Sequence, residues 1–79
     1  VEKQTHTVLG NIATLLKGAG LDMSDIIKTT LFIKDMNDFS IVNAIYAEYF
    51  TSDYPARSTV EVARLPKDAL IEIECIAKY

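Results

Sequence analysis

Arg57 and Glu72 are the two residues whose types could do chemistry together. Arg57 follows a Pro-Ala pair, and Glu72 lies in an isoleucine-rich run. A guanidinium can hold a small carboxylate through two parallel N–H donors, and an acid in the same region could act on the bound molecule. The alternative is ordinary surface charge at the end of a sheet, because exposed charges and ion pairs are common and usually contribute little. The residue pattern leaves both interpretations open.

Two strand-like runs must position these residues, Ser58 to Arg64 and Leu70 to Ala77. Successive residues of a strand point to opposite faces, so Arg57 and Glu72 each share a face with every second residue of their run. The short link at 65–69 favours antiparallel pairing of the two runs. Such a hairpin would place Arg57 and Glu72 on neighbouring strands, several residues apart in a tight register.

Residues 2–19 are predicted to form an amphipathic helix. Its buried face follows the i, i+3, i+4 spacing and consists of Thr5, Val8, Leu9, Ile12, Leu15, Leu16 and Ala19. Gly20 suits the left-handed position that follows a helix. His6 is interpreted as a surface residue of this helix, because no carboxylate or nucleophile lies at a spacing that would orient it for catalysis.

Residues 26–34 are predicted to form a strand, because they are rich in β-branched and aromatic side chains. Alternation places four mainly apolar residues on one face: Ile27, Thr29, Leu31 and Ile33. The other face is mostly polar but carries Phe32. A phenylalanine in that position suits contact with a neighbouring subunit or the wall of a cleft.

A second helix is predicted to begin after the turn at 35–38, with Asn37 or Asp38 as its N-cap, and to continue to about Phe50. Its wide aromatic face is expected to pack into the core and consists of Phe39, Val42, Ile45, Tyr46, Tyr49 and Phe50. Asn43 is a polar residue beside this face, either exposed or hydrogen-bonded to a neighbouring loop. The segment 51–54 is expected to close the helix, and Pro55 then sets the chain extended.

The predicted order of elements is helix, strand, helix, strand, strand, within a single domain over residues 1–79. A strand–helix–strand unit usually leaves its two strands parallel. The fold class is therefore α+β, with a mixed β-sheet and two helices on one face. The other sheet face would be bare, so it must be covered by strands outside this sequence, by another subunit, or by both.

Composition excludes several classes of protein. The net charge of -3 argues against a general binder of nucleic acid or of a membrane surface, which normally carries a basic patch. No apolar run approaches the ~18 residues needed to span a bilayer. A single cysteine, Cys75, excludes an internal disulfide and fits a reducing, cytoplasmic compartment. With one histidine and no Cys/His cluster, no metal and no cofactor is expected.

Three segments resemble one known family. They are IIKTTLFIKDMNDF at 26–39, VNAIYAEYF at 42–50 and PARSTVEVARLPKDALIEIE at 55–74. Together with the first helix, they make the chain similar to the RidA (YjgF-type) reactive intermediate deaminases along essentially its whole length. The resemblance implies a chorismate-mutase-like α+β sheet that assembles as a homotrimer, with sites at the clefts between subunits.

The resemblance also implies strands that precede the first helix. Family members carry an N-terminal segment with a Gly-Pro-Tyr-Ser motif and a Ser-Gly-Gln motif, and neither motif occurs in this sequence. The 79 residues are therefore expected to be the C-terminal two-thirds or so of the family domain, without its N-terminal strands.

Roles for five residues follow from matching positions in the family. Arg57 matches the arginine that binds the substrate carboxylate, and Glu72 matches the glutamate that holds or activates the attacking water. Asn43 matches an asparagine of the site region, and the backbone of Ser58 and Thr59 is expected to help hold the carboxylate. Many relatives have cysteine in place of Thr59, so a thiol-based role is not expected here. Cys75 is expected to be a small core residue.

The activity implied by the resemblance is deamination of reactive enamines and imines. The substrates would be 2-aminoacrylate, 2-iminobutanoate and 2-iminopropanoate, hydrolysed to 2-keto acids and ammonia without a cofactor. Two other classes stay open. One is a non-catalytic trimer that binds small carboxylates or acts like a chaperone. The other is an endoribonuclease or translation inhibitor, which the net charge of -3 makes a weaker candidate.

Overall fold

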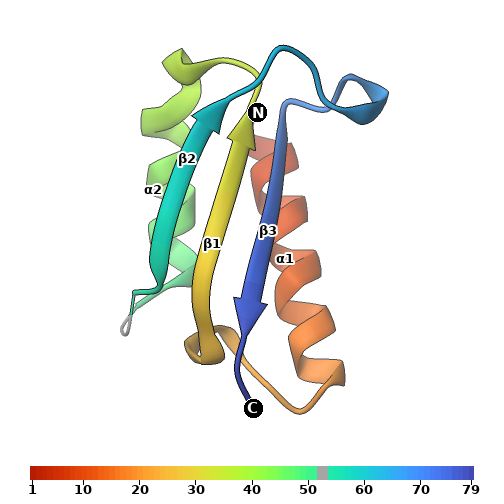
Figure 1. The fold of residues 1–79 in the computed structure, drawn as a ribbon, viewed down its shortest axis with the longest axis vertical. Helices are drawn as coiled ribbons and strands as arrows, with labels where there is room; N and C mark the ends of the chain where they lie inside the picture. The colour runs from red at the N-terminus through yellow and green to blue at the C-terminus, as the bar shows by residue number, and fades with distance from the viewer. Residues whose placement is uncertain (52–53) are drawn as a thin grey trace.

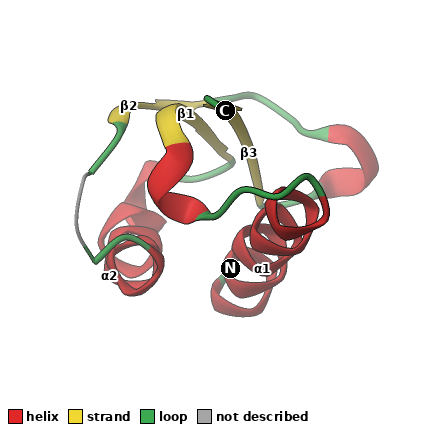
Figure 2. Ribbon diagram, turned by 90° about the horizontal axis from the view of Figure 1, so that it is seen from below, coloured by secondary structure: helices red, strands yellow, loops and turns green. Residues whose placement is uncertain are grey.

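The computed structural model describes residues 1–51 and 54–79, which form two layers. One layer is a three-stranded sheet, and the other consists of two helices, α1 (Glu2–Gly18) and α2 (Phe39–Tyr49). Both helices lie on the same side of the sheet, as Figure 2 shows. The predicted α+β class with two helices on one face is confirmed. Of the segment expected to close the second helix, residues 52–53 lie outside the described part of the chain.

The strand β1 (Ile26–Ile33) is the centre of the sheet, whose strand order is β2-β1-β3 (Figure 1). It runs parallel to β2 (Ala56–Glu61) and antiparallel to β3 (Ile71–Ala77). The parallel pair follows from the helical crossover through α2. The predicted hairpin of the last two strands is wrong, because β2 and β3 flank β1 and do not pair with each other. The chain between them at 62–70 is long enough to pass the end of one strand, a step of ~10 Å.

The segment 62–70 that joins β2 to β3 is fixed by an ion pair within it and by a hydrogen bond to α1. Lys67 and Asp68 both have positive φ, 57° and 54°, a region that residues other than glycine seldom adopt. The Arg64 guanidinium binds the Asp68 carboxylate through two N–H donors, with Nε–Oδ1 and Nη2–Oδ2 distances of 2.6 and 3.1 Å. This contact raises the pKa of Arg64. The Leu70 N–H then donates to Gln4 Oε1 at 2.8 Å, which ties the start of β3 to α1.

The helix α1 ends in a glycine cap, as predicted. Gly20 has a φ of 80°, and its N–H donates to the Lys17 carbonyl. The Leu21 N–H reaches back to the Leu16 carbonyl at 2.8 Å. This pair of bonds is the Schellman arrangement, which satisfies the last carbonyls of the helix.

The buried stripe of α1 is narrower than predicted. Its buried residues are Thr5, Leu9 and Leu16, with Val8 and Ile12 packed at the margin of the core. Leu15 is 74% exposed and Ala19 is also exposed, so the prediction that they face the core is wrong. The helix packs against α2 and β3, and these two residues lie on its solvent side. Among the described residues, no helix is long and apolar enough to cross a membrane.

The core lies between β1 and the two helices. The buried residues of β1 that face the helices are Thr29, Leu31 and Ile33, as alternation predicted. The side chains of α2 that cover them are Val42, Ile45 and Tyr46, with Phe50 beyond the helix end. Asp38 is the N-cap residue of α2, although its side chain makes no capping hydrogen bond. Phe39 and Tyr49 are half-buried at the margin of this core.

The alternation breaks at the start of β1. Its register with β3 shifts between Ile26 and Lys28, so one residue is added to the strand at that point. As a result Ile26 is 3% exposed and Ile27 is 53% exposed. The prediction that Ile27 shares one face of the strand with Thr29, Leu31 and Ile33 is therefore wrong.

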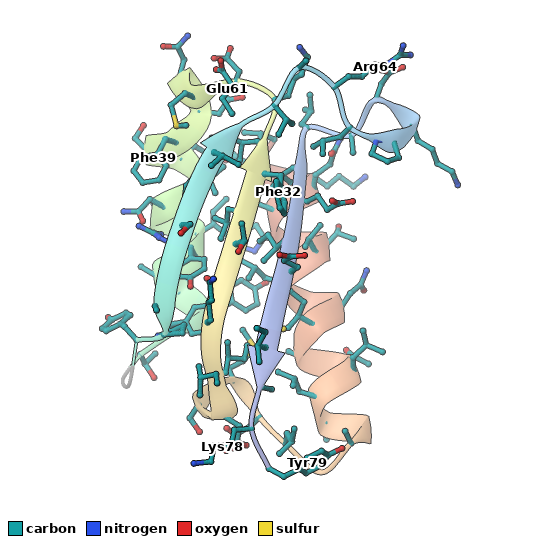
Figure 3. The ribbon with its side chains drawn as sticks, in the orientation of Figure 1. Phe32, Phe39, Glu61, Arg64, Lys78 and Tyr79 are labelled. Carbon is teal, nitrogen blue, oxygen red and sulfur yellow. The ribbon has the colours of Figure 1, made fainter. Side chains whose placement is uncertain are left out.

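The sheet face away from the helices has no element of the described chain upon it (Figure 2). Phe32 lies on this face between β1 and β3 (Figure 3). Val60 and Ile76 are exposed there as well, among charged side chains of the same face. The bare face inferred from the sequence is thus present in the structure.

The register shift predicts different effects for two adjacent isoleucines. Ile26→Ala should lower the free energy of unfolding by about 2–5 kcal/mol, because it leaves a cavity in the core. Ile27→Ala is the matched control and should cost clearly less, since its side chain is half in solvent. Chemical denaturation of both variants measures the two costs. Equal costs would show that both side chains are buried and that the shift is absent.

Candidate functional site

Arg57 points toward the helix layer from the edge strand β2. It lies beside Thr29 in the parallel register, and neighbouring residues in register project from the same face. Its Nη1 donates to Asn43 Oδ1 on α2, with an N–O distance of 2.6 Å. From the sequence, Asn43 could be exposed or hydrogen-bonded to a neighbouring loop. In the structure its side chain instead accepts a hydrogen bond from Arg57 on a strand.

Three residues of α2 contact the Arg57 guanidinium from one side, and the residue is otherwise exposed. Phe39, Asn43 and Tyr46 are spaced i, i+4 and i+7, which places them on one side of a helix. The Arg57 Cζ lies 4.8 Å from the Tyr46 ring centre and 5.5 Å from the Phe39 ring centre. Both distances suit attraction between a cation and an aromatic ring.

Tyr46 is itself fixed by two further contacts. Its hydroxyl lies 2.8 Å from Thr29 Oγ1, and the two residues are 5% and 1% exposed. Its ring stacks on Phe50 with centres 4.4 Å apart. Because a buried hydroxyl without a partner is costly, the pair with Thr29 allows a tyrosine at this depth of the core. The sequence predicted Tyr46 as a core residue, and its contact with Arg57 was missed.

A cavity of about 470 Å³ opens beside this group. Its lining residues are Asn43, Tyr46, Ala47, Tyr54, Pro55 and Arg57. Ala47, Tyr54 and Pro55 were not predicted as site residues. The sequence could have indicated them only through their neighbours. Tyr54 and Pro55 directly precede Ala56-Arg57, and Ala47 follows Tyr46 on α2.

Glu72 and Ser58 lie on the other side of the sheet. Glu72 is opposite Phe32 and Ser58 is opposite Thr30, both on the face without helices. Arg57 and Glu72 are thus separated by the whole of β1 and by the thickness of the sheet. The expectation that they lie on neighbouring strands is wrong, and a single chain does not bring them together.

Thr59 shares a face with Arg57 but does not line the cavity. Its Oγ1 is buried and has no hydrogen-bond partner among the described residues. A buried, unpaired hydroxyl is unfavourable, and it is not presented to a ligand in this cavity. Any contribution of Thr59 to binding would therefore come from its backbone.

Cys75 and His6 lie away from this cavity. Cys75 is opposite Thr29 on β3 and packs against the core, and burial raises the pKa of its thiol. A protonated, partly buried thiol suits the core role that the sequence predicted. His6 is exposed on α1, and its Nδ1 lies 3.1 Å from the Tyr49 hydroxyl, which links the two helices. Among the described residues, no three His, Cys, Asp or Glu side chains are grouped so as to hold a metal ion.

Comparison with known families identifies the class of protein. Residues 1–79 match the family described as Endoribonuclease L-PSP. The chain belongs to this family, which includes the RidA deaminases. It is 54% identical over 80 residues to the 2-iminobutanoate/2-iminopropanoate deaminase of Escherichia coli, covering 98% of this chain and 62% of that protein.

Solved structures agree with this assignment. A Rid-family protein of unknown function from Yersinia pestis is 56% identical, with a TM-score of 0.96 over 99% of this chain and 63% of its own. The E. coli TdcF structure with bound serine is 47% identical, with a TM-score of 0.92 over 96% of this chain and 62% of its own. The chain thus spans about three-fifths of the length of these relatives.

The two buried threonine hydroxyls should respond oppositely to the same substitution. Thr59→Val removes an unpaired hydroxyl and should leave the free energy of unfolding unchanged or raise it by ~1 kcal/mol. Thr29→Val leaves the Tyr46 hydroxyl buried without its partner and should lower it by ~1–3 kcal/mol. Thermal or urea unfolding measures both. A destabilising Thr59→Val would mean that its hydroxyl has a hydrogen-bond partner after all.

Proposed function

We propose that the protein containing this chain is a deaminase that hydrolyses 2-iminobutanoate, 2-iminopropanoate and related enamines to 2-keto acids and ammonia. The observation that carries the proposal is the Arg57 guanidinium, held by α2 at the wall of an open cavity. The name of the E. coli relative supports the reaction. The serine bound to TdcF supports a small ligand with a carboxylate. We propose a cytoplasmic site of action.

In this proposal Arg57 anchors the substrate carboxylate. Its Nη1 is committed to Asn43, while Nε and Nη2 have no partner among the described residues. Two N–H groups of a guanidinium match the two oxygens of a carboxylate. A backbone donor adds to them. The Val62 N–H donates to the Ile33 carbonyl, so alternation turns the Thr59 N–H away from β1, toward the open edge of β2.

Glu72 handles the water in this proposal. The water oxygen adds to the imine carbon while Glu72 accepts one water proton and passes it to the nitrogen. The resulting carbinolamine transfers its hydroxyl proton to the nitrogen by way of Glu72, and the C–N bond breaks to give the 2-keto acid and ammonia. Because Arg57 and Glu72 lie on opposite faces of one chain, we propose that a complete site needs a second copy to supply Glu72. A homotrimer with sites at the clefts between subunits meets this need and covers the bare sheet face.

A second candidate function is RNA cleavage. Its support is the description of the family as Endoribonuclease L-PSP and the name of a Thermotoga maritima relative, which also contains the word endoribonuclease. The net charge of -3 weighs against it, because RNA binding depends on cationic contacts with phosphates. A non-catalytic carboxylate-binding trimer is the third. Hydrolysis of RNA by chelator-treated protein, lost in Arg57→Ala, would favour the nuclease. Binding of 2-keto acids with no turnover of imines would favour the third.

Arg57→Ala tests the anchor. It should lower kcat/KM for 2-iminobutanoate about 30-fold or more, because a charge pair with the substrate is lost, and Arg57→Lys should not restore the rate. The exposed Arg64, paired with Asp68, gives the matched control Arg64→Ala, which should retain activity. Assembly, measured by light scattering, should be unchanged in all three. Unchanged turnover in Arg57→Ala would contradict the anchoring role.

Glu72→Gln tests the water-handling role. It should lower kcat ~100- to 10,000-fold and leave the Kd of 2-ketobutanoate nearly unchanged, since the amide keeps the shape but cannot accept a proton. Glu74→Gln, on the same strand and the same face, is the control and should have little effect. Equal losses of kcat and of keto-acid affinity in Glu72→Gln would indicate a binding role instead.

A further inference from the structure

The Arg57 guanidinium lies on an edge strand, where a long side chain would ordinarily sample many rotamers. Among the described residues its one hydrogen-bond partner is Asn43, which holds Nη1 alone. One hydrogen bond does not fix a planar group, because the group can still rotate about it. Two rings of α2, Phe39 and Tyr46, also lie against it, with their centres 5.5 and 4.8 Å from Cζ. Figure 3 shows Phe39 projecting from α2.

We propose that Phe39 and Tyr46 are positioning residues, which hold the Arg57 guanidinium in the orientation that binds the substrate carboxylate. This inference rests on the proposed anchoring role of Arg57. The two rings restrict rotation of the guanidinium plane, and Asn43 fixes its Nη1 end. The N–H groups that remain are then ordered before the substrate arrives. Ordering a side chain in advance lowers the entropy lost on binding.

The two rings differ in how they are held. Tyr46 cannot move aside, because its hydroxyl is bonded to the buried Thr29 and its ring stacks on Phe50. It is a rigid surface for the guanidinium. Phe39 begins α2 and is only half-buried, so its ring can be removed with less damage to the core. The two residues are seven positions apart, which places them on the same side of α2, and both rings therefore reach Arg57 on β2.

The test measures the coupling between the rings and Arg57 by binding of 2-ketobutanoate, a carboxylate that requires no turnover. Phe39→Leu should weaken binding about 2- to 12-fold, the ordering cost of one side chain. In the Arg57→Ala background the same substitution should change binding less than 2-fold, because the group it positions is gone. Under turnover, Phe39→Leu should raise KM for 2-iminobutanoate and leave kcat nearly unchanged.

Two further variants complete the design. Tyr46→Leu should weaken binding at least as much as Phe39→Leu, and the Phe39 result decides the question if this variant does not fold. Tyr49→Leu removes a tyrosine of the same helix that contacts His6 and not Arg57, so it should leave binding unchanged. All measurements use the natural polypeptide that contains these 79 residues, in its assembled form.

The outcomes separate this inference from the anchoring role. Keto-acid binding that is unaffected by Arg57→Ala would overturn the anchor and, with it, the positioning role. Binding that is weakened in Arg57→Ala but unchanged in Phe39→Leu would overturn the positioning role alone. So would a loss in Phe39→Leu that persists in the Arg57→Ala background, because the ring would then act through the fold or by direct contact with the ligand.

Discussion

The structure depends on the position of β1 between two partner strands. Its residues Thr29, Leu31 and Ile33 are buried beneath both helices, and its backbone pairs with β2 on one side and β3 on the other. Because the register on both sides is set against β1, this strand decides which face every residue of β2 and β3 occupies. A slip of one residue would exchange Arg57 for Ser58 at the cavity.

Local patterns predicted the elements and most of their faces. Alternation correctly placed Arg57 with Thr59 and Glu72 with Glu74, because period-two geometry is a property of the strand itself. It could not give the pairing partner, since a short link permits a hairpin and also permits a step past one strand. The register shift at Ile26 was not visible either, because both neighbours are isoleucine and either could be buried.

The candidate site was predicted in part. The family resemblance predicted Arg57, Glu72 and Asn43 as site residues, and the structure places Arg57 and Asn43 at the cavity but not Glu72. A sequence motif does not give the sheet face, or the subunit, from which a side chain projects. The role of Tyr46 was hidden for a different reason. A tyrosine within an apolar stripe of a helix is normally predicted as a core residue. Here the Tyr46 side chain is buried in the core and its ring also contacts the Arg57 guanidinium.

The open face of the sheet has a consequence for how the protein associates. Val60 and Ile76 lie exposed there beside Lys28, Glu72 and Glu74. A wholly apolar surface pressed onto this face would remove those charges from water without giving them partners, which is strongly unfavourable. Only a surface with charges in matching places can bury the apolar residues at low cost. The charges on this face therefore favour a partner surface that carries opposite charges at matching positions over one that is only apolar.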